Sequence, residues 1–218
     1  MQGGLKASLT FEVLLETAPQ LSQPWLKASF ILILVGYGTK MGLAPMHTWK
    51  PDAYGEAPGV IGGIFAGGIT SGAFLALLRF YQICNAAGES AFMSKLLIFM
   101  GLFSMAVAGI FMLSQKDFKR MLAYSTISHM GFMLLGIISA DSDGYSSAMF
   151  YMVVYVIITL GTFGMIMLLS REEHEVEKID DFKGLNRRSP WYAFITLLFM
   201  LSLAGIPPTV GFYAKLSV

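Results

Sequence analysis

The chain has 218 residues, of which 55% are hydrophobic and only 13% charged, whereas a soluble domain carries about 25% charged residues. Its 15 Lys and Arg residues nearly balance its 14 Asp and Glu residues, which excludes the basic surface that nucleic acid binds. The single cysteine, Cys84, excludes an internal disulfide, a multi-cysteine zinc site and an iron–sulfur cluster held by this chain alone. The composition predicts an all-α, polytopic membrane protein, and any redox chemistry would belong to a partner.

Six apolar stretches are long enough to cross a membrane as helices, because a spanning helix needs about 20 such residues. Residues 1–25 are mixed in polarity and contain prolines, which predicts an extramembrane or interfacial lead-in to a transmembrane domain at 26–218. The last stretch is still apolar where the sequence stops, so we expect a fragment of a longer protein. The expected spans are 26–49, 58–81, 91–114, 121–140, 145–170 and 190–218.

An even number of spans places both ends on one side of the membrane, and the distribution of Lys and Arg indicates which side. We predict that the charged loop 171–188 is cytoplasmic, with its acidic run 171–181 solvated and no metal bound through His174, and that both ends are periplasmic. The opposite end has four basic residues: Lys6, Lys27, Arg79 and Lys95. The loops after the first, third and fifth spans carry nine: Lys50, Lys116, Lys119, Arg120, Arg171, Lys178, Lys183, Arg187 and Arg188.

Lysines lie inside two of the expected spans, Lys40 in the first and Lys215 in the sixth. A charge at bilayer depth costs about 2.5–3.5 kcal/mol, so by default it faces a polar cavity and serves ion movement. The alternative is a side chain that reaches the headgroups. Interrupted helices indicate an ion pathway, and a packing kink is the other explanation. The breakers are Gly36, Gly38, Gly42 and Pro45 around Lys40, and Gly205, Pro207, Pro208 and Gly211 before Lys215.

The second expected span carries glycines at overlapping GxxxG spacings, which predicts a face packed closely against a neighbouring helix. We interpret Arg79, at the end of this span, as an anchor that reaches the membrane surface. Pairing of Arg79 with Asp52 or Glu56 is the alternative. The glycines are Gly63, Gly67, Gly68 and Gly72.

His129 lies well inside the fourth span, and an imidazole can pass protons in either direction. A hydrogen-bonded structural histidine is the alternative. Tyr151, Tyr155 and Thr159 follow on the next span at i, i+4 and i+8, so their hydroxyls share one helix face. Such hydroxyls can hold a water wire or can hydrogen bond across helices. The His129 helix also carries Ser125, Thr126 and Ser128.

Three segments resemble the antiporter-like, proton-translocating subunits of respiratory complex I, membrane-bound hydrogenases and multisubunit cation/proton antiporters. They are GTKMGLAPMHTWKPDAYGEAP, SQKDFKRMLAYSTISHMGFMLLGI and DFKGLNRRSPWYAFITLLFMLSLAGIPPTVGFYAKL. The resemblance covers nearly all of the chain after residue 25. The last ninety or so residues are most similar to the N subunit of bacterial NADH:quinone oxidoreductase, and residues 26 to about 125 are closer to the hydrogenase-type F subunit. Either the lineage mixes features or the sequence joins two relatives.

The resemblance implies a larger inverted-repeat fold with two broken helices, in which 26–81 ends the first five-helix repeat and 91–218 forms most of the second. It implies proton translocation through Lys40, His129 and Lys215. Lys40 matches the family's buried lysine, whose glutamate partner belongs to a helix outside this sequence.

Three departures from the family pattern concern polar residues. Ser71 stands where many members carry a lysine, which puts the usual lysine-to-lysine relay in doubt, and Lys50 stands where an apolar residue is usual. Sister subunits tend to carry histidines and a lysine in place of the hydroxyl stripe. The residues expected to support proton transfer here are Ser71, Tyr151, Tyr155 and Thr159.

The function implied is that of a proton-translocating membrane subunit of respiratory NADH:quinone oxidoreductase in the bacterial inner membrane. The chain has no Rossmann fingerprint and no cysteine cluster, so NADH, FMN, iron–sulfur clusters and quinone would be bound by partner subunits. We expect no cofactor or metal site in this chain, and we expect the other membrane subunits and the lipid bilayer as its partners. The alternatives are a subunit of a membrane-bound hydrogenase or formate hydrogenlyase, a subunit of a cation/proton antiporter carrying H⁺ or Na⁺, and a scaffold whose buried lysines balance partner carboxylates.

Overall fold

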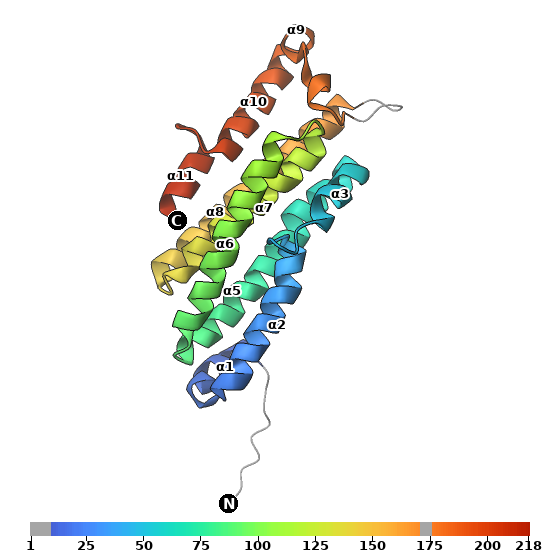
Figure 1. Ribbon diagram of the computed structural model, residues 1–218. Coiled ribbons are helices and arrows are strands. Elements are labelled where there is room, and N and C mark those ends of the chain that lie inside the picture. The colour runs from blue at the N-terminus through green and yellow to red at the C-terminus, as the bar shows by residue number, and fades with distance from the viewer. Residues whose placement is uncertain (1–9, 171–175) are drawn as a thin grey trace, which may run out of the picture.

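The computed structural model describes residues 10–170 and 176–218, and its regular structure there is helical apart from an isolated bridge between Asp117 and Lys178 (Figure 1). The all-α prediction is therefore confirmed for this part of the chain. The elements are α1 (Phe11–Thr17), η1 (Ala18–Gln20), α2 (Gln23–Met41), α3 (Trp49–Glu56), α4 (Gly59–Ile64), η2 (Phe65–Ile69), α5 (Thr70–Ala86), α6 (Ser90–Leu113), α7 (Phe118–Ile138), α8 (Ser142–Leu169), η3 (Ile179–Phe182), α9 (Leu185–Arg188), α10 (Pro190–Ala204) and α11 (Val210–Ser217).

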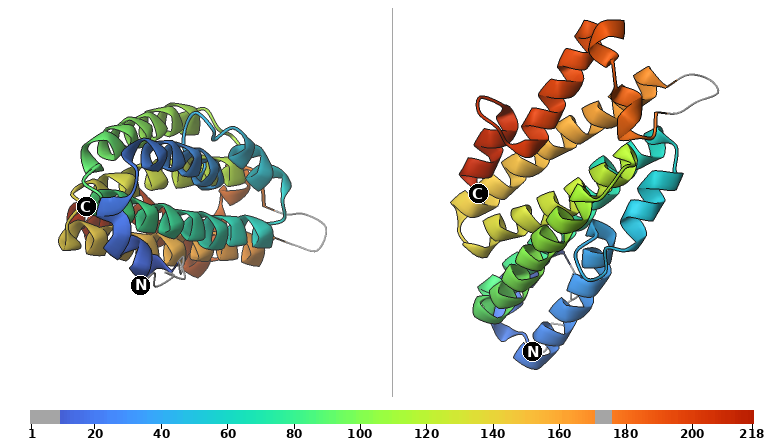
Figure 2. Two further views of the ribbon diagram at one scale, coloured as in Figure 1. Left: turned by 90° about the horizontal axis from the view of Figure 1, so that it is seen from below. Right: turned by 45° about the horizontal axis from the view of Figure 1, so that its top comes forward.

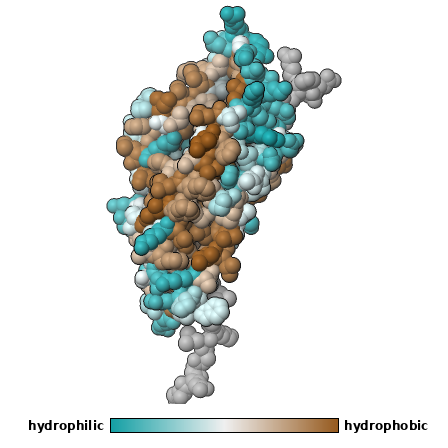
Figure 3. All heavy atoms as spheres, viewed as in Figure 1, coloured by the Kyte–Doolittle hydropathy of each residue, from teal (hydrophilic) through white to brown (hydrophobic). Residues whose placement is uncertain are grey.

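Among the described residues, four helical segments are long and apolar enough to cross a membrane. The first combines α4, η2 and α5, and the others are α6, α7 and α8. The first and sixth expected spans are instead interrupted, because α2 ends at Met41 and α10 ends at Ala204. Apolar side chains cover the middle of the face shown in Figure 3, and hydrophilic side chains gather toward its ends. The chain is a multi-pass membrane protein.

Helix α7 has the central place in the bundle, where it packs against α3, α6 and α8. Helices α10 and α11 pack on α8, and α2 packs on α5, so the two interrupted helices flank the bundle on opposite sides (Figures 1 and 2). Helices α6 and α7 approach most closely where Gly101 faces Gly131, since a Cβ on Gly131 would lie 2.6 Å from the carbonyl oxygen of Gly101. The polar side chains of α7 and α8 therefore lie between the break after α2 and the break after α10.

The glycine row of α4, η2 and α5 meets α8 along one edge. A Cβ on Gly63 would lie 3.4 Å from Phe163, and a Cβ on Gly67 would lie 3.2 Å from another α8 side chain. No atom would lie within 4 Å of a Cβ on Gly68 or Gly72. The packing prediction is confirmed for Gly63 and Gly67. For Gly68 and Gly72 it stays a prediction, because the helical phase turns both toward the outside of the described bundle.

The loops that follow the first, third and fifth expected spans gather at one end of the bundle (Figure 1). The Phe118 N–H donates to the carbonyl oxygen of Glu177 at 2.6 Å, which joins the last of these loops to the start of α7. Arg120 pairs with Glu56 at 3.2 Å and with Asp52 at 3.6 Å, which joins α3 to α7. This shared end agrees with the predicted topology. Residues 171–175 of the predicted cytoplasmic loop, including His174, lie outside the described residues.

The structure corrects the interpretation of Lys50 and Lys119 as loop charges. It also pairs the proposed alternative partners of Arg79 with another residue. Lys50 is fully buried and Lys119 is 1% exposed, so counting both as loop charges was wrong. Both lie next to an apolar stretch in the sequence, and tertiary contacts bury them: Lys50 donates to the Met41 carbonyl oxygen, and Lys119 donates to the Ala57 carbonyl oxygen and pairs with Glu177. Arg79 lies over the ring of Phe11 at 5.5 Å, whereas the acidic residues proposed as its alternative partners pair with Arg120.

Candidate functional site

The break between α10 and α11 places the Lys215 ammonium against backbone carbonyl groups that have no hydrogen-bond partner within α10. Helix α10 is capped at its C-terminus by Gly205, which adopts a left-handed conformation with φ 76°. The chain then turns into α11, and Lys215 Nζ donates to the carbonyl oxygens of Leu203 at 3.0 Å and Ala204 at 2.9 Å. The last carbonyls of a helix have no partner within it, so the lysine satisfies them. Lys215 is half-buried at a helix break, which is the environment expected of a lysine on a polar pathway.

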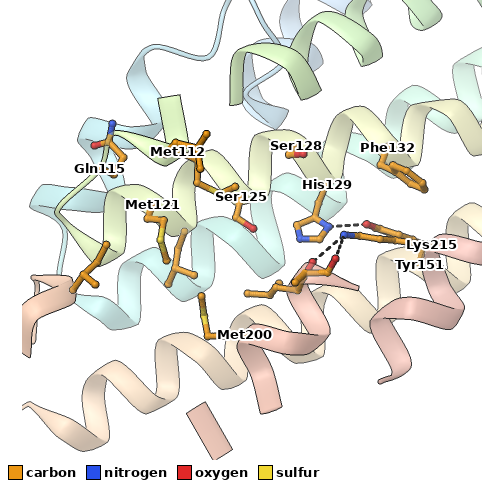
Figure 4. Close-up of a pocket in the computed structure, with 15 residues that line it drawn as sticks. Met112, Gln115, Met121, Ser125, Ser128, His129, Phe132, Tyr151, Met200 and Lys215 are labelled. Carbon is orange, nitrogen blue, oxygen red and sulfur yellow. Dashed lines mark hydrogen bonds between the residues drawn. The ribbon is translucent and has the colours of Figure 1, made fainter. Parts of the chain in front are cut away.

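A cavity of about 510 Å³ lies beside Lys215. His129 of α7 and Tyr151 of α8 line it together with Lys215 (Figure 4). His129 Nδ1 and the Tyr151 hydroxyl oxygen are hydrogen bonded at 2.6 Å. Polar side chains Ser125 and Ser128 line the same cavity among apolar ones. The structure therefore brings two of the three predicted proton carriers to the lining of one cavity that has enough room for water.

Helix α8 turns the rest of the predicted hydroxyl stripe into the interior. The Tyr155 and Thr159 hydroxyls are buried and make no hydrogen bond within the described part of the chain. The Tyr155 hydroxyl faces Thr126 of α7, and its ring centroid lies 5.5 Å from that of His129. Buried hydroxyls without protein partners normally bind ordered water. The stripe is thus suited to hold a short water wire next to His129.

At the first break, which follows α2, Lys50 also lies against a carbonyl group at the end of a helix. The sequence analysis did not identify Lys50 as a site residue. Helix α2 is capped at its C-terminus by Gly42, which is left-handed with φ 78°. Lys50 Nζ donates to the carbonyl oxygen of Met41 at 2.7 Å and to the Thr70 hydroxyl at 3.2 Å. The signal in the sequence was that Lys50 replaces the usual apolar residue of a recognised motif.

Two other predicted site residues lie elsewhere. Lys40 is exposed on α2, where its ammonium lies 5.6 Å from the centroid of the Tyr37 ring. The structure does not bring Lys40 together with His129 or Lys215, and its role in proton transfer stays a prediction. Ser71 is buried, and its hydroxyl makes no hydrogen bond to another described residue.

Comparison with known sequences identifies relatives over most of the chain. Residues 2–218 match the family described as NADH:quinone oxidoreductase/Mrp antiporter, TM. The chain is 48% identical over 191 residues to NADH-quinone oxidoreductase subunit N of Thiobacillus denitrificans, an alignment that covers 86% of this chain and 39% of that protein. It is 42% identical over 216 residues to the subunit N of Methylovorus glucosotrophus, covering 99% of this chain and 44% of that protein. The chain therefore spans less than half the length of these curated relatives.

Solved structures with the same fold come from respiratory membrane complexes. A chain of respiratory complex I from Thermus thermophilus with bound NADH superposes with a TM-score of 0.83 at 25% identity, covering 96% of this chain and 44% of that one. A chain of the membrane-bound sulfane sulfur reductase, an archaeal respiratory membrane complex, gives 0.82 at 26% identity, covering 94% and 42%. Sequence and fold agree, and the chain belongs to the NADH:quinone oxidoreductase/Mrp antiporter family of transmembrane proteins.

Proposed function

We propose that the chain is part of a proton-translocating membrane subunit of NADH:quinone oxidoreductase in the bacterial inner membrane. The observation that carries this proposal is the cavity where Lys215 meets the hydrogen-bonded pair of His129 and Tyr151. The curated relatives are named subunit N of this enzyme, which favours it over the hydrogenase and antiporter alternatives. Electron transfer in partner subunits then drives proton movement through the polar groups of this subunit.

The geometry gives His129 and Lys215 complementary tasks. A neutral imidazole accepts a proton at one ring nitrogen and releases one from the other, and Tyr151 occupies the Nδ1 side. Lys215 can carry a proton on its amine beside the same cavity. Because two positive charges in an apolar cavity repel each other, a proton that reaches one group favours release from the other. Protons would therefore cross this cavity one at a time.

We also propose that the subunit relies on partners for its redox chemistry. Its single cysteine is too few for an iron–sulfur cluster, and its sequence has no Rossmann fingerprint for NADH. NADH, FMN, iron–sulfur clusters and quinone would then be bound by other subunits of the complex. The surrounding membrane subunits and lipid are the direct neighbours of this chain.

Replacing His129 by leucine tests the proposed function. We expect His129→Leu to lower the number of protons translocated per NADH oxidised by at least about tenfold, since a positioned proton carrier contributes about 10²–10⁴ to a proton-transfer rate. The measurement is acidification of inverted membrane vesicles that contain the assembled complex. Met200→Leu changes another cavity-lining residue without removing a proton carrier and is expected to retain translocation. Normal translocation by His129→Leu would reject the proposed pathway.

The orientation of the subunit follows from its basic end. We propose that the end with loop 171–188 faces the cytoplasm, because basic residues accumulate on that side of membrane proteins. Lys183 lies there, and its side chain is 77% exposed. A cysteine introduced by Lys183→Cys is expected to react with a membrane-impermeant maleimide in inverted vesicles and to stay unlabelled in intact spheroplasts. The reverse pattern would place this loop in the periplasm.

A further inference from the structure

Lys50 is a buried cation that the proposed pathway does not yet use. Its side chain is fully buried, and its ammonium lies 5.7 Å from the centroid of the Tyr54 ring. Its hydrogen-bond acceptors are neutral oxygens of Met41 and Thr70, and within residues 10–170 and 176–218 it forms no ion pair. Burying an ammonium is costly unless a carboxylate or water compensates the charge. A lysine that serves packing alone would not need this environment.

The surroundings of Lys50 repeat those of Lys215. Each helix end is a glycine with positive φ, 78° at Gly42 and 76° at Gly205. In each case the lysine ammonium donates to a carbonyl oxygen of the helix's last turn. A Cβ on Gly42 would lie 2.5 Å from Lys50 Cδ, and a Cβ on Gly205 would lie 2.6 Å from Lys215 Cδ. The two breaks therefore hold their lysines by the same local arrangement.

Buried hydroxyls lead inward from Lys50. Thr70 accepts its hydrogen bond from Lys50 at the point where the π-helical turn η2 meets α5, and π-helical turns are frequent at functional sites. The Tyr54 hydroxyl faces the hydroxyls of Thr70 and Thr126 but is hydrogen bonded to neither. Thr126 also faces Tyr155. The hydroxyls of Thr70, Tyr54, Thr126 and Tyr155 thus form a line of neighbours from the first break to the stripe beside His129. Hydrogen bonds do not join them in this structure, because Thr70 and Thr126 donate to the carbonyl oxygens of Phe65 at 2.8 Å and Ala123 at 2.7 Å.

We propose that Lys50 is the proton-carrying lysine of the first broken helix and the counterpart of Lys215. This inference rests on the proposed function. The step moves one proton and no electrons: an N–H bond of Lys50 breaks, and its electron pair stays on nitrogen. The Thr70 oxygen takes the proton as its own O–H turns away from the Phe65 carbonyl oxygen, to which it donates at 2.8 Å, and gives its proton to the Tyr54 hydroxyl oxygen. A proton arriving from the opposite direction reloads the amine. His129 and Lys215 then receive the proton at the second break.

The Thr70 pair tests this step without changing the lysine. Thr70→Val keeps the side-chain shape and removes the hydroxyl that accepts a hydrogen bond from Lys50, and Thr70→Ser retains it. In inverted vesicles of the assembled complex, we expect Thr70→Val to lower protons translocated per NADH oxidised at least about tenfold and Thr70→Ser to stay near wild type. Normal translocation and an unchanged pH profile in Thr70→Val would overturn the inference.

Lys50 itself is tested by Lys50→Met, which has a similar length and no charge. We expect the variant to assemble, because replacing a buried charge by an apolar side chain of similar volume is often neutral or stabilising, and to lose translocation at least about tenfold. Lys119→Met is the burial-matched control: Lys119 is 1% exposed but pairs with Glu177 at the end of the bundle. If Lys50→Met does not assemble, the Thr70 pair decides. Lys50→Met with wild-type translocation would overturn the inference.

Parallel measurements on His129→Leu separate this inference from the function on which it rests. Loss of translocation in His129→Leu with retention in Lys50→Met and Thr70→Val would leave the proposed function standing and reject the role of Lys50. Retention in all of these variants would reject the proposed function itself. Loss in all of them, with the Lys119→Met control unchanged, is the result that we expect.

Discussion

Replacement of Lys215 by alanine is expected to reduce proton translocation per NADH oxidised by at least about tenfold while leaving part of the NADH oxidation intact. The reason is that the amine borders the cavity beside His129 and forms the end of the polar line in this chain. Redox centres in partner subunits would still accept electrons, so the loss would appear as uncoupling. The measurement compares acidification with NADH consumption in the same inverted vesicles.

Lys215→Arg separates proton transfer from support of the helix break. A guanidinium can still donate to the carbonyl oxygens of Leu203 and Ala204 but does not deprotonate in proteins. We expect Lys215→Arg to assemble normally and to translocate little better than Lys215→Ala. Lys183→Met, which removes an exposed lysine outside the cavity, is the control and is expected to be unchanged. Recovery of translocation by Lys215→Arg would show that Lys215 stabilises the helix break and does not carry protons.

Hydropathy predicted the helical class, and the resemblance to a known family pointed to His129 and Lys215 as site residues. The structure brings both together with Tyr151 because α7 and α11 pack on α8, a tertiary arrangement that the residue pattern of a single helix does not reveal. The i, i+4 spacing predicted that Tyr155 and Thr159 share one helix face, and the structure buries that face in the interior. Their roles in proton transfer remain predictions that the variants above test.

The first broken helix could not be interpreted from hydropathy in the same way. Lys40 lies within the apolar stretch, yet the buried residues of α2 include Leu34, Gly38 and Met41, and the helical phase turns Lys40 away from that face. Lys50 lies just beyond the stretch, where hydropathy predicts a loop charge. A tertiary contact, the return of the chain beneath the end of α2, places Lys50 in the interior. No local pattern in the sequence encodes that return.

Gly131→Ala is expected to impair assembly of the subunit. Its Cβ would lie 2.6 Å from the carbonyl oxygen of Gly101, and a backbone atom cannot move aside without shifting the whole of α6 from α7. Overpacking of a core costs about 1–3 kcal/mol. The shift would also reach the first break, because the Ser104 hydroxyl of α6 accepts a hydrogen bond from the Ala44 N–H at 2.9 Å.

Gly109→Ala is the matched control, since it adds the same methyl group to α6 at a position with no atom within 4 Å. Alanine favours a helix over glycine by about 1 kcal/mol, so this variant should assemble at least as well as wild type. The measurements are the amount of subunit that co-purifies with the complex and the midpoint of its thermal unfolding in detergent. Equal values for Gly131→Ala and Gly109→Ala would show that α6 and α7 tolerate separation. In that case the close contact of α6 and α7 would not be needed to position the first break and Lys50 beside the line of hydroxyls.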